Sequence, residues 1–348
     1  MREQARELFF KGGVIPALPL VLKDDRSFDE EGQRRLIRYY MHAGADGLAV
    51  AVHTTQFAIR DKEVGLFEPL IRMAMEEITA YQEENGRTVI AVCGVCGERE
   101  QAVREAKLAC EAGYDAVLLS PGGLGHLSEE DLIERTRAIA SILPVIAFYL
   151  QPSVGGRMFS FKYWKELCGI SGVVGVKAAP FNRYGTLDVV RAVKESGRAD
   201  EIALYTGNDD NIVLDLLTGF RFDQNEEGIR FAGGLLGHWA VWTSSVVRMF
   251  RELKNLRGQD TLSAGVLTLA AQITDCNAAF FDTANGFKGC IAGIHEVLRR
   301  QGLMNNILTL DPGEGMSPGQ ADEIDRVYAA YPQLNDDAFV MEFLSSQG

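Results

Sequence analysis

Eight short apolar runs, rich in valine, isoleucine, leucine and alanine, recur along this chain with helical patterns between them. From the third run onward they begin roughly 27 to 29 residues apart, which is the length of one strand, one helix and two short loops. We therefore expect eight strands, at residues 14–20, 47–52, 88–92, 116–119, 145–149, 173–177, 202–206 and 230–233.

The runs are continuously apolar rather than alternating, which is typical of strands covered on both faces in a parallel sheet. Eight such units in series predict an α/β fold, a (β/α)₈ TIM barrel, over residues 1–240. After about residue 238 only helical periodicity follows, at 241–256, 263–280, 291–301 and 317–331. We expect residues 241–348 to form the last barrel helix and a C-terminal helical extension.

Helix boundaries can be read at several points of this pattern. Ser27-Phe-Asp-Glu30 has the form of a capping box and predicts the start of a helix, and Ser128 predicts another start. Gly44 and Gly113 follow helical segments and predict their ends.

Charge and cysteine content exclude several classes of partner. The formal net charge is −13 at pH 7, so we expect no nucleic acid and no membrane as a partner. The N-terminal residues mix charges and lack the apolar segment of a signal peptide. Six scattered cysteines are too few for a disulfide framework in a chain of this length, and we expect a cytoplasmic protein.

Lys177 is the lysine that stands apart from the other nine. It ends an apolar run, where functional residues of such barrels gather, and no acid follows it closely in sequence. An ammonium in apolar surroundings has a lowered pKa, and the free amine can attack a carbonyl carbon. The pattern indicates a Schiff-base lysine, although its stem could instead pack while its head reaches the barrel rim.

Other candidates follow neighbouring strands. Tyr149 ends the preceding run, and a phenol beside Lys177 could move protons for the same substrate. Thr54 and Thr55 follow the second run and offer hydroxyls and N–H groups to a carboxylate. The loop with Asp209 could bind substrate hydroxyls or cap a helix.

Taken together, these positions resemble the dihydrodipicolinate synthase and N-acetylneuraminate lyase family of class I aldolases. The similarity runs from about Gly12 to Met304 and rests on motifs in family-like order. These are Val14-Ile-Pro-Ala-Leu-Pro19, Ala43-Gly-Ala-Asp-Gly47, the Thr-Thr pair, Tyr149-x-x-Pro152, Gly175-x-Lys177 and Gly207-x-Asp209.

The resemblance implies that Lys177 forms an imine with a 2-keto acid such as pyruvate, with an aldehyde as a possible second substrate. Tyr149 would be the acid–base group and Thr54 its proton-relay partner. Thr54 and Thr55 would hold the substrate carboxylate, and Gly207 and Asp209 would also bind substrate. The resemblance further implies a homotetramer built from two dimers, with no metal or organic cofactor.

Three departures concern the substrate. The family's Gly-Thr-Thr-Gly-Glu reads His53-Thr-Thr-Gln-Phe57 here, and the relay tyrosine after the fourth strand is missing from Ser120-Pro-Gly-Gly123. Val154 takes the place of the synthase arginine, and Arg157 is a candidate to replace it. The lysine-pathway synthase is therefore not expected, whereas an aldolase, a hydratase-aldolase or a sugar-acid dehydratase is. His53, Gln56, His126, Asn182 and Asp209 are further candidates to line the pocket.

Two other functions remain open. The glycines of Gly233-Gly-Leu-Leu-Gly237-His238 could bind phosphate in a phosphosugar isomerase or a metal-dependent aldolase. The five histidines show no zinc-site spacing. The altered Thr-Thr loop and the missing tyrosine would also fit a catalytically silent barrel that binds a keto acid.

Overall fold

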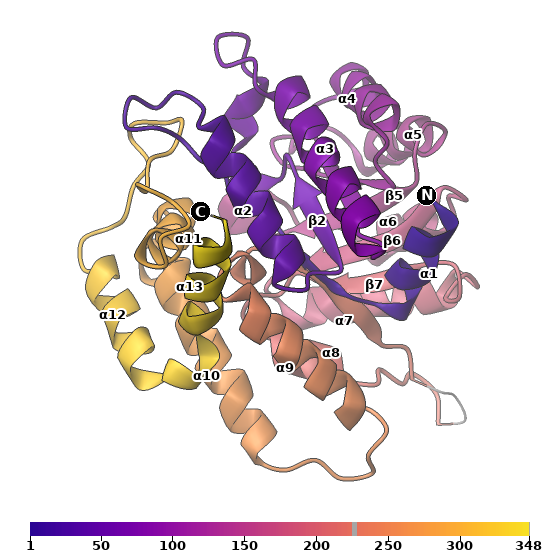
Figure 1. The fold of residues 1–348 in the computed structure, drawn as a ribbon. Coiled ribbons are helices and arrows are strands. Elements are labelled where there is room, and N and C mark those ends of the chain that lie inside the picture. Colours follow the sequence, from indigo (N-terminus) through magenta and orange to yellow (C-terminus); the bar gives the residue numbers. More distant parts are fainter. Residues whose placement is uncertain (225–227, 348) are drawn as a thin grey trace.

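The structure is a computed structural model that describes residues 1–224 and 228–347. Its centre is a barrel of eight parallel strands (Figure 1). The ladder runs from β1 through β8, β7 and the strands before it to β2, and a parallel bridge between Ala17 and Ala49 closes the circle. The strands are β1 (Val14–Pro16), β2 (Gly47–Val50), β3 (Ile90–Val95), β4 (Ala116–Leu119), β5 (Val145–Leu150), β6 (Val173–Ala179), β7 (Ala203–Thr206) and β8 (Phe231–Leu236).

One helix follows each strand, so the predicted (β/α)₈ barrel is confirmed. These helices are α2 (Glu30–His42), α3 (Phe67–Asn85), α4 (Arg99–Ala112), α5 (Glu129–Ala140), α6 (Phe161–Cys168), α7 (Arg183–Glu195), α8 (Ile212–Leu217) and α9 (Thr243–Leu256).

Helix capping follows the sequence in one place and departs from it in another. Ser128 and Asp131 form the expected capping box at α5. The prediction for Ser27 is wrong, because Asp29 caps α2 by accepting a hydrogen bond from the Gly32 N–H at 3.0 Å. Ser27 instead closes a turn on Asp25.

Two layers of apolar side chains surround the strands. Inward-facing residues such as Ile15, Ile90 and Phe148 fill the lumen, whereas outward-facing ones pack under the helices. An unpredicted helix, α1 (Glu3–Lys11), closes the amino-terminal end of the barrel. There the Phe9 ring stacks on Tyr205 with centroids 4.6 Å apart, so the lumen is open to ligands at the carboxyl-terminal end of the strands.

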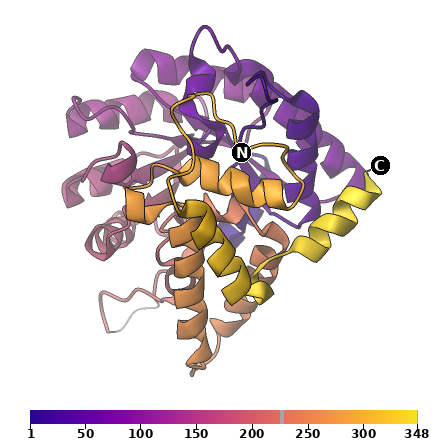
Figure 2. The same cartoon turned by 90° about the vertical axis from the view of Figure 1, so that its left-hand side faces the viewer.

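The helices after α9 lie together on one flank of the barrel (Figure 2). They are α10 (Gly265–Phe280), α11 (Cys290–Arg300), α12 (Gln320–Ala330) and α13 (Asp337–Ser346). The first three match the predicted helical segments, and α13 was not predicted. Among the described residues, no helix combines the length and the apolar character needed to cross a membrane.

Candidate active site

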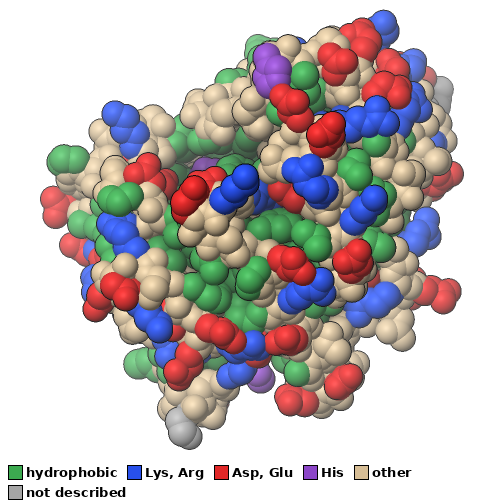
Figure 3. Space-filling model, turned by 90° about the horizontal axis from the view of Figure 1, so that it is seen from above, with side chains coloured by type: hydrophobic (Ala, Val, Ile, Leu, Met, Phe, Trp, Pro, Cys, Tyr) green, Lys and Arg blue, Asp and Glu red, His purple; other side chains and the backbone are tan. Residues whose placement is uncertain are grey.

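A cavity opens at the carboxyl-terminal end of the barrel. Its walls come from β4, β5 and β6, from residues 52–54 just after β2, and from three residues of the helical extension, Phe281, Phe287 and Cys290. Figure 3 looks down on this end and shows a depression lined by hydrophobic side chains, with charged side chains around it. Polar groups inside it are therefore poorly solvated, which strengthens every charge interaction there.

Lys177 extends from β6 into this cavity. It is only 8% exposed, and its Nζ lies 4.2 Å from the centre of the Phe148 ring. In the described part of the chain the Nζ has neither a hydrogen bond nor an ion pair within 4.0 Å. Burial lowers the pKa of Lys177, and the nearby Asp209 carboxylate opposes that change. The free amine that imine formation requires is thus accessible near neutral pH.

Gly207 makes room for the lysine. A Cβ at this position would lie 2.5 Å from Lys177 Cε and 2.8 Å from Ala179 Cβ. A side chain at 207 would therefore displace the amine. This gives the expected substrate-contacting residue Gly207 a steric reason to be glycine.

Asp209 lies in the same cavity, in the loop after β7. Its Oδ1 accepts a hydrogen bond from the His238 backbone N–H at 3.0 Å. Burial raises the pKa of Asp209, while the Lys177 charge works in the opposite direction. The carboxyl group has one anchored oxygen, and Oδ2 has no protein hydrogen bond in the described part of the chain.

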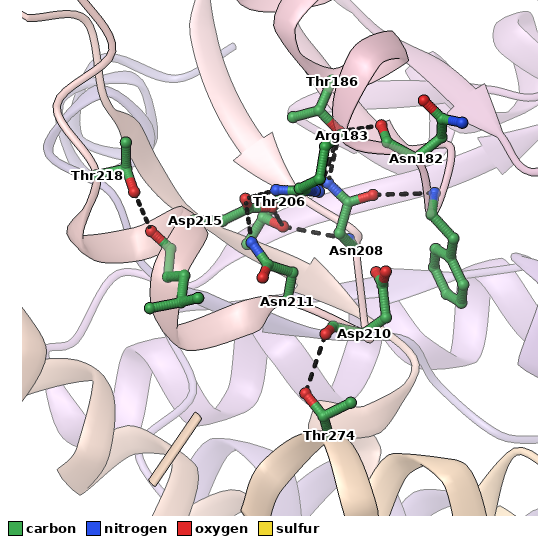
Figure 4. A network of polar contacts seen from close by, with 12 residues as sticks. Asn182, Arg183, Thr186, Thr206, Asn208, Asp210, Asn211, Asp215, Thr218 and Thr274 are labelled. Carbon is green, nitrogen blue, oxygen red and sulfur yellow. Dashed lines mark hydrogen bonds and ion pairs between the residues drawn. The ribbon is translucent and has the colours of Figure 1, made fainter. Parts of the chain in front are cut away.

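A polar network behind the loop fixes Asp209 in place (Figure 4). Asn208 Nδ2 donates to Asp215 Oδ2 at 2.9 Å and to Thr186 Oγ1 at 3.1 Å, and its Oδ1 accepts from the Phe181 N–H at 3.1 Å. Thr206 Oγ1 also donates to Asp215 Oδ2, at 2.7 Å. Asn208 therefore ties the loop after β7 to the loop after β6, which bears Phe181.

Thr54 and Thr55 differ in their position relative to the cavity. Thr54 lines the cavity, and its hydroxyl donates to the Leu18 carbonyl at 3.1 Å. Thr55 Oγ1 donates to the same carbonyl at 2.6 Å and accepts from the Val52 N–H at 3.1 Å. Thr55 is not among the residues that line the cavity. Of the two threonines, Thr54 alone lines the cavity, and a role of either hydroxyl toward a substrate carboxylate stays a prediction.

Tyr149 does not lie beside Lys177, contrary to expectation. In the β5–β6 ladder Phe148 pairs with Lys177 and shares its face, whereas Tyr149 pairs with Ala178 and points outward. Its ring packs at 4.9 Å from the Trp164 ring, and its hydroxyl contacts Met158 Sδ at 3.4 Å. A shift of one residue in a strand moves a side chain to the opposite face. The ladder is irregular at the start of β5, and sequence spacing alone could not show which face Tyr149 takes.

His53 is the one histidine of the predicted set that reaches the cavity. Burial, with a smaller contribution from the Lys177 charge, lowers the pKa of His53 to about 4. The imidazole is therefore neutral at pH 7 and can donate or accept a hydrogen bond.

The other candidates for the pocket are engaged elsewhere. Arg157 Nη1 donates to the Leu127 carbonyl at 2.7 Å, and Arg157 is not among the residues that line the cavity, whereas Val154 is. His126 pairs with a glutamate outside the cavity, Asn182 caps α7, and the Gln56 Oε1 accepts from the Leu310 N–H at 2.6 Å.

The glycine-rich segment after β8 is filled rather than open. A Cβ at Gly234 would lie 2.5 Å from the Trp239 ring, and one at Gly237 would lie 2.8 Å from the Phe281 ring. These glycines allow aromatic rings to pack closely, and nothing there forms a phosphate cradle. Within residues 1–224 and 228–347, no three His, Cys, Asp or Glu side chains are placed to hold a metal ion.

Sequence reasoning missed the apolar lining. Phe148 was part of a predicted strand without an assigned face, and Phe281, Phe287 and Cys290 belong to an extension that showed no link to the site. Helical periodicity predicts that such residues are buried but not against which element.

Comparisons with known proteins agree with this architecture. The model of the dihydrodipicolinate synthetase family matches residues 10–221. The chain is 27% identical over 210 residues to an N-acetylneuraminate lyase of Citrobacter koseri, covering 60% of this chain and 66% of the relative. It is likewise 27% identical to a 4-hydroxy-tetrahydrodipicolinate synthase of Moorella thermoacetica, with 59% and 66% covered. Both matches thus span slightly less than two thirds of the relative.

A solved structure shares the fold. It is a prophage protein from E. coli K12, belonging to the dihydrodipicolinic acid synthase family and determined in complex with pyruvate. The TM-score is 0.72 at 18% identity, and the match covers 93% of this chain and 98% of the other.

Proposed function

The chain belongs to the dihydrodipicolinate synthetase family, and from that premise we propose that it is a Schiff-base-forming lyase acting on a 2-keto acid. The observation that carries the proposal is the Lys177 amine, which is buried, unpaired by any described residue and directed into the cavity at the barrel mouth. Its Nζ would attack the keto carbon, and one amine hydrogen would move to the carbonyl oxygen to give a carbinolamine. Protonation of that hydroxyl and loss of water would then leave an iminium ion, whose nitrogen keeps the second hydrogen.

The substrate is proposed to be pyruvate or a pyruvate-derived compound, with an aldehyde as a possible product or co-substrate. The relatives include an N-acetylneuraminate lyase, and the structure of the E. coli prophage protein contains pyruvate. Thr54 is the proposed partner of the substrate carboxylate. With Val154 at the position of the synthase arginine and Arg157 directed elsewhere, we favour an aldolase, a hydratase-aldolase or a dehydratase over the lysine-pathway synthase.

Borohydride reduction tests the proposal directly. Incubating the protein with pyruvate or another 2-keto acid and then with borohydride should add the mass of the reduced keto acid to the peptide that contains Lys177. The variant Lys177→Met, which keeps a similar side-chain volume, should show no adduct. No adduct on the wild-type protein across a panel of 2-keto acids would contradict the proposal.

A catalytically silent barrel is the second candidate, and one observation favours it. Phe148 occupies the position beside Lys177 where a phenol would otherwise assist proton transfer. Such a protein would bind a keto acid without turnover. Saturable binding by calorimetry, combined with the absence of any borohydride adduct, would select this alternative.

We also propose a cytoplasmic location and a homotetramer built from two dimers. All six cysteines are free, as is usual in a reducing compartment, and the tetramer rests on the family resemblance. Light scattering coupled to size exclusion would give the assembly state, and cell fractionation would give the location.

A further inference from the structure

The proposed lyase needs a group that exchanges protons beside the imine. Tyr205 of β7 pairs with Lys177 and faces the lumen, but its hydroxyl donates to the Phe9 carbonyl at 2.8 Å, and Tyr205 is not among the residues that line the cavity. Phe148 faces the amine, and the Tyr149 hydroxyl lies on the outer side of β5 against Met158. Of the cavity-lining side chains other than Lys177, the ionisable ones are Asp209, His53 and Cys290.

Two of these three are poorly suited to the task. The Cys290 thiol is buried, which raises its pKa and keeps it protonated. His53 is neutral near pH 7, and burial holds its pKa at about 4, too low for it to serve as an imidazolium acid. Cys290 also comes from α11, on the extension side of the cavity.

Asp209 has the required placement. It lies in the cavity with Lys177, and the two side chains interact electrostatically. Its Oδ1 is oriented by the His238 N–H, and Gly207 between β7 and Asp209 leaves space for the lysine chain. The network around Asn208 holds this loop from behind (Figure 4). The free oxygen is thus part of a rigidly supported carboxyl group.

We propose that Asp209, rather than a tyrosine, is the acid–base residue that works with Lys177; this inference rests on the proposed function. As the protonated acid, Asp209 donates its proton to the departing hydroxyl of the carbinolamine. The C–O bond breaks, water leaves, and the products are an iminium ion on Lys177 and the Asp209 carboxylate as its counter-ion.

The same carboxylate then removes a proton from the carbon next to the iminium carbon. The electron pair of that C–H bond moves into the new C=C bond, the iminium nitrogen becomes a neutral enamine nitrogen, and Asp209 is again the acid. Burial, which raises the pKa of Asp209, supports this alternation between the two forms near neutral pH.

Exchange of the pyruvate methyl protons in D₂O, followed by ¹H NMR, measures this step without knowledge of a second substrate. Asp209→Asn keeps the side-chain shape and an oxygen for the His238 N–H, and it should slow the exchange by about 10²-fold or more. Asp209→Glu should recover part of the rate, and Tyr149→Phe should stay within about twofold of the wild type. Borohydride trapping of pyruvate on Asp209→Asn after long incubation should still yield the Lys177 adduct.

Four results would overturn the inference. Normal exchange by Asp209→Asn contradicts it, and a loss of exchange in Tyr149→Phe would return the role to the phenol. Comparable loss in His53→Asn with retention in Asp209→Asn would assign the role to the imidazole. If wild-type protein formed no adduct at all, the proposed function would fail and the inference with it. Unchanged urea unfolding midpoints exclude misfolding as the cause of any loss.

Discussion

Asp209 and Asp215 stand six residues apart after β7 and are both buried, yet their surroundings differ sharply. Asp209 faces the cavity and has one hydrogen bond, from the His238 N–H. Asp215 lies in α8. Its carboxylate accepts hydrogen bonds from Thr206, Asn208, Asn211 and Arg183. A carboxylate whose oxygens are all occupied stabilises the fold, whereas one left partly unpaired stays available for chemistry.

The largest effect is expected for substitution of Lys177. Lys177→Met should lower pyruvate proton exchange by on the order of 10⁴-fold or more, because the nucleophile is gone. Since the variant also removes a buried amine without a close partner, its free energy of unfolding should rise by about 1–2 kcal/mol. NMR exchange and urea unfolding measure the two quantities, and unaltered exchange would mean that another lysine carries the reaction.

Substitution of Asp215, whose two carboxylate oxygens both accept hydrogen bonds, should instead lower the free energy of unfolding. Asp215→Ala leaves the Thr206 and Asn208 donors without their acceptor, and we expect a loss of about 3–5 kcal/mol in the free energy of unfolding. Asp209→Asn is the matched control and should change that free energy by less than about 1 kcal/mol. Equal losses in the two variants would remove the distinction between the two aspartates.

His295, a buried residue of α11, provides a check on whether incomplete hydrogen bonding generally costs stability. Burial lowers the pKa of His295 to about 4, and its Nε2 has no hydrogen-bond partner among the described residues. Because the folded pKa lies below the unfolded value of about 6.5, the unfolded state binds a proton first as the pH falls. This contribution is neutral at pH 7 and destabilises the protein progressively between about pH 6.5 and 4.

The variant His295→Gln should therefore lose less stability than the wild type between pH 7 and pH 5, by about 2 kcal/mol. Chemical unfolding at the two pH values gives the difference. Parallel pH dependence in the two proteins would show that His295 is not titrated on unfolding in this range.

The smallest effect is expected for Thr206, one of the four residues that donate a hydrogen bond to Asp215. Thr206→Val removes one hydrogen bond to Asp215 while three other donors remain, so the loss should be about 1 kcal/mol. Pyruvate exchange should be nearly unchanged if Asn208 alone suffices to hold the loop. A loss as large as that of Asp215→Ala would show that the network acts as one unit.

Much of the barrel could be predicted from the sequence because its period is carried by local patterns. The strand β4 has its predicted bounds, 116–119, and β1 ends at Pro16, four residues before the predicted limit. Beyond Pro16 the pairing continues as an isolated bridge between Ala17 and Ala49, so the apolar run extends past the regular strand. Helix α1, at the amino-terminal end of the barrel, was not predicted. Its short amphipathic pattern does not show that Phe9 packs against Tyr205 inside the barrel.

The site was predictable only where one strand end determined it. Lys177 and Asp209 reach the cavity as expected, since Lys177 lies two residues before the end of β6 and Asp209 follows β7. Tyr149 does not, because the face of a strand residue depends on the pairing register, and that register includes an irregularity at Val145. The aromatic wall from Phe281 and Phe287 depends on contacts between segments more than 100 residues apart.

That wall has a consequence for how the chain folds while it is being synthesised. A ribosome delivers the chain from its N-terminus, and the barrel strands are complete by Leu236, whereas Phe281, Phe287 and Cys290 emerge later. The segment after them binds back to the earliest loops, through Asn306 on the Leu22 carbonyl at 3.0 Å. Lys177 is therefore synthesised before the residues that complete the wall of its cavity. The closed cavity can form only after translation has passed Cys290.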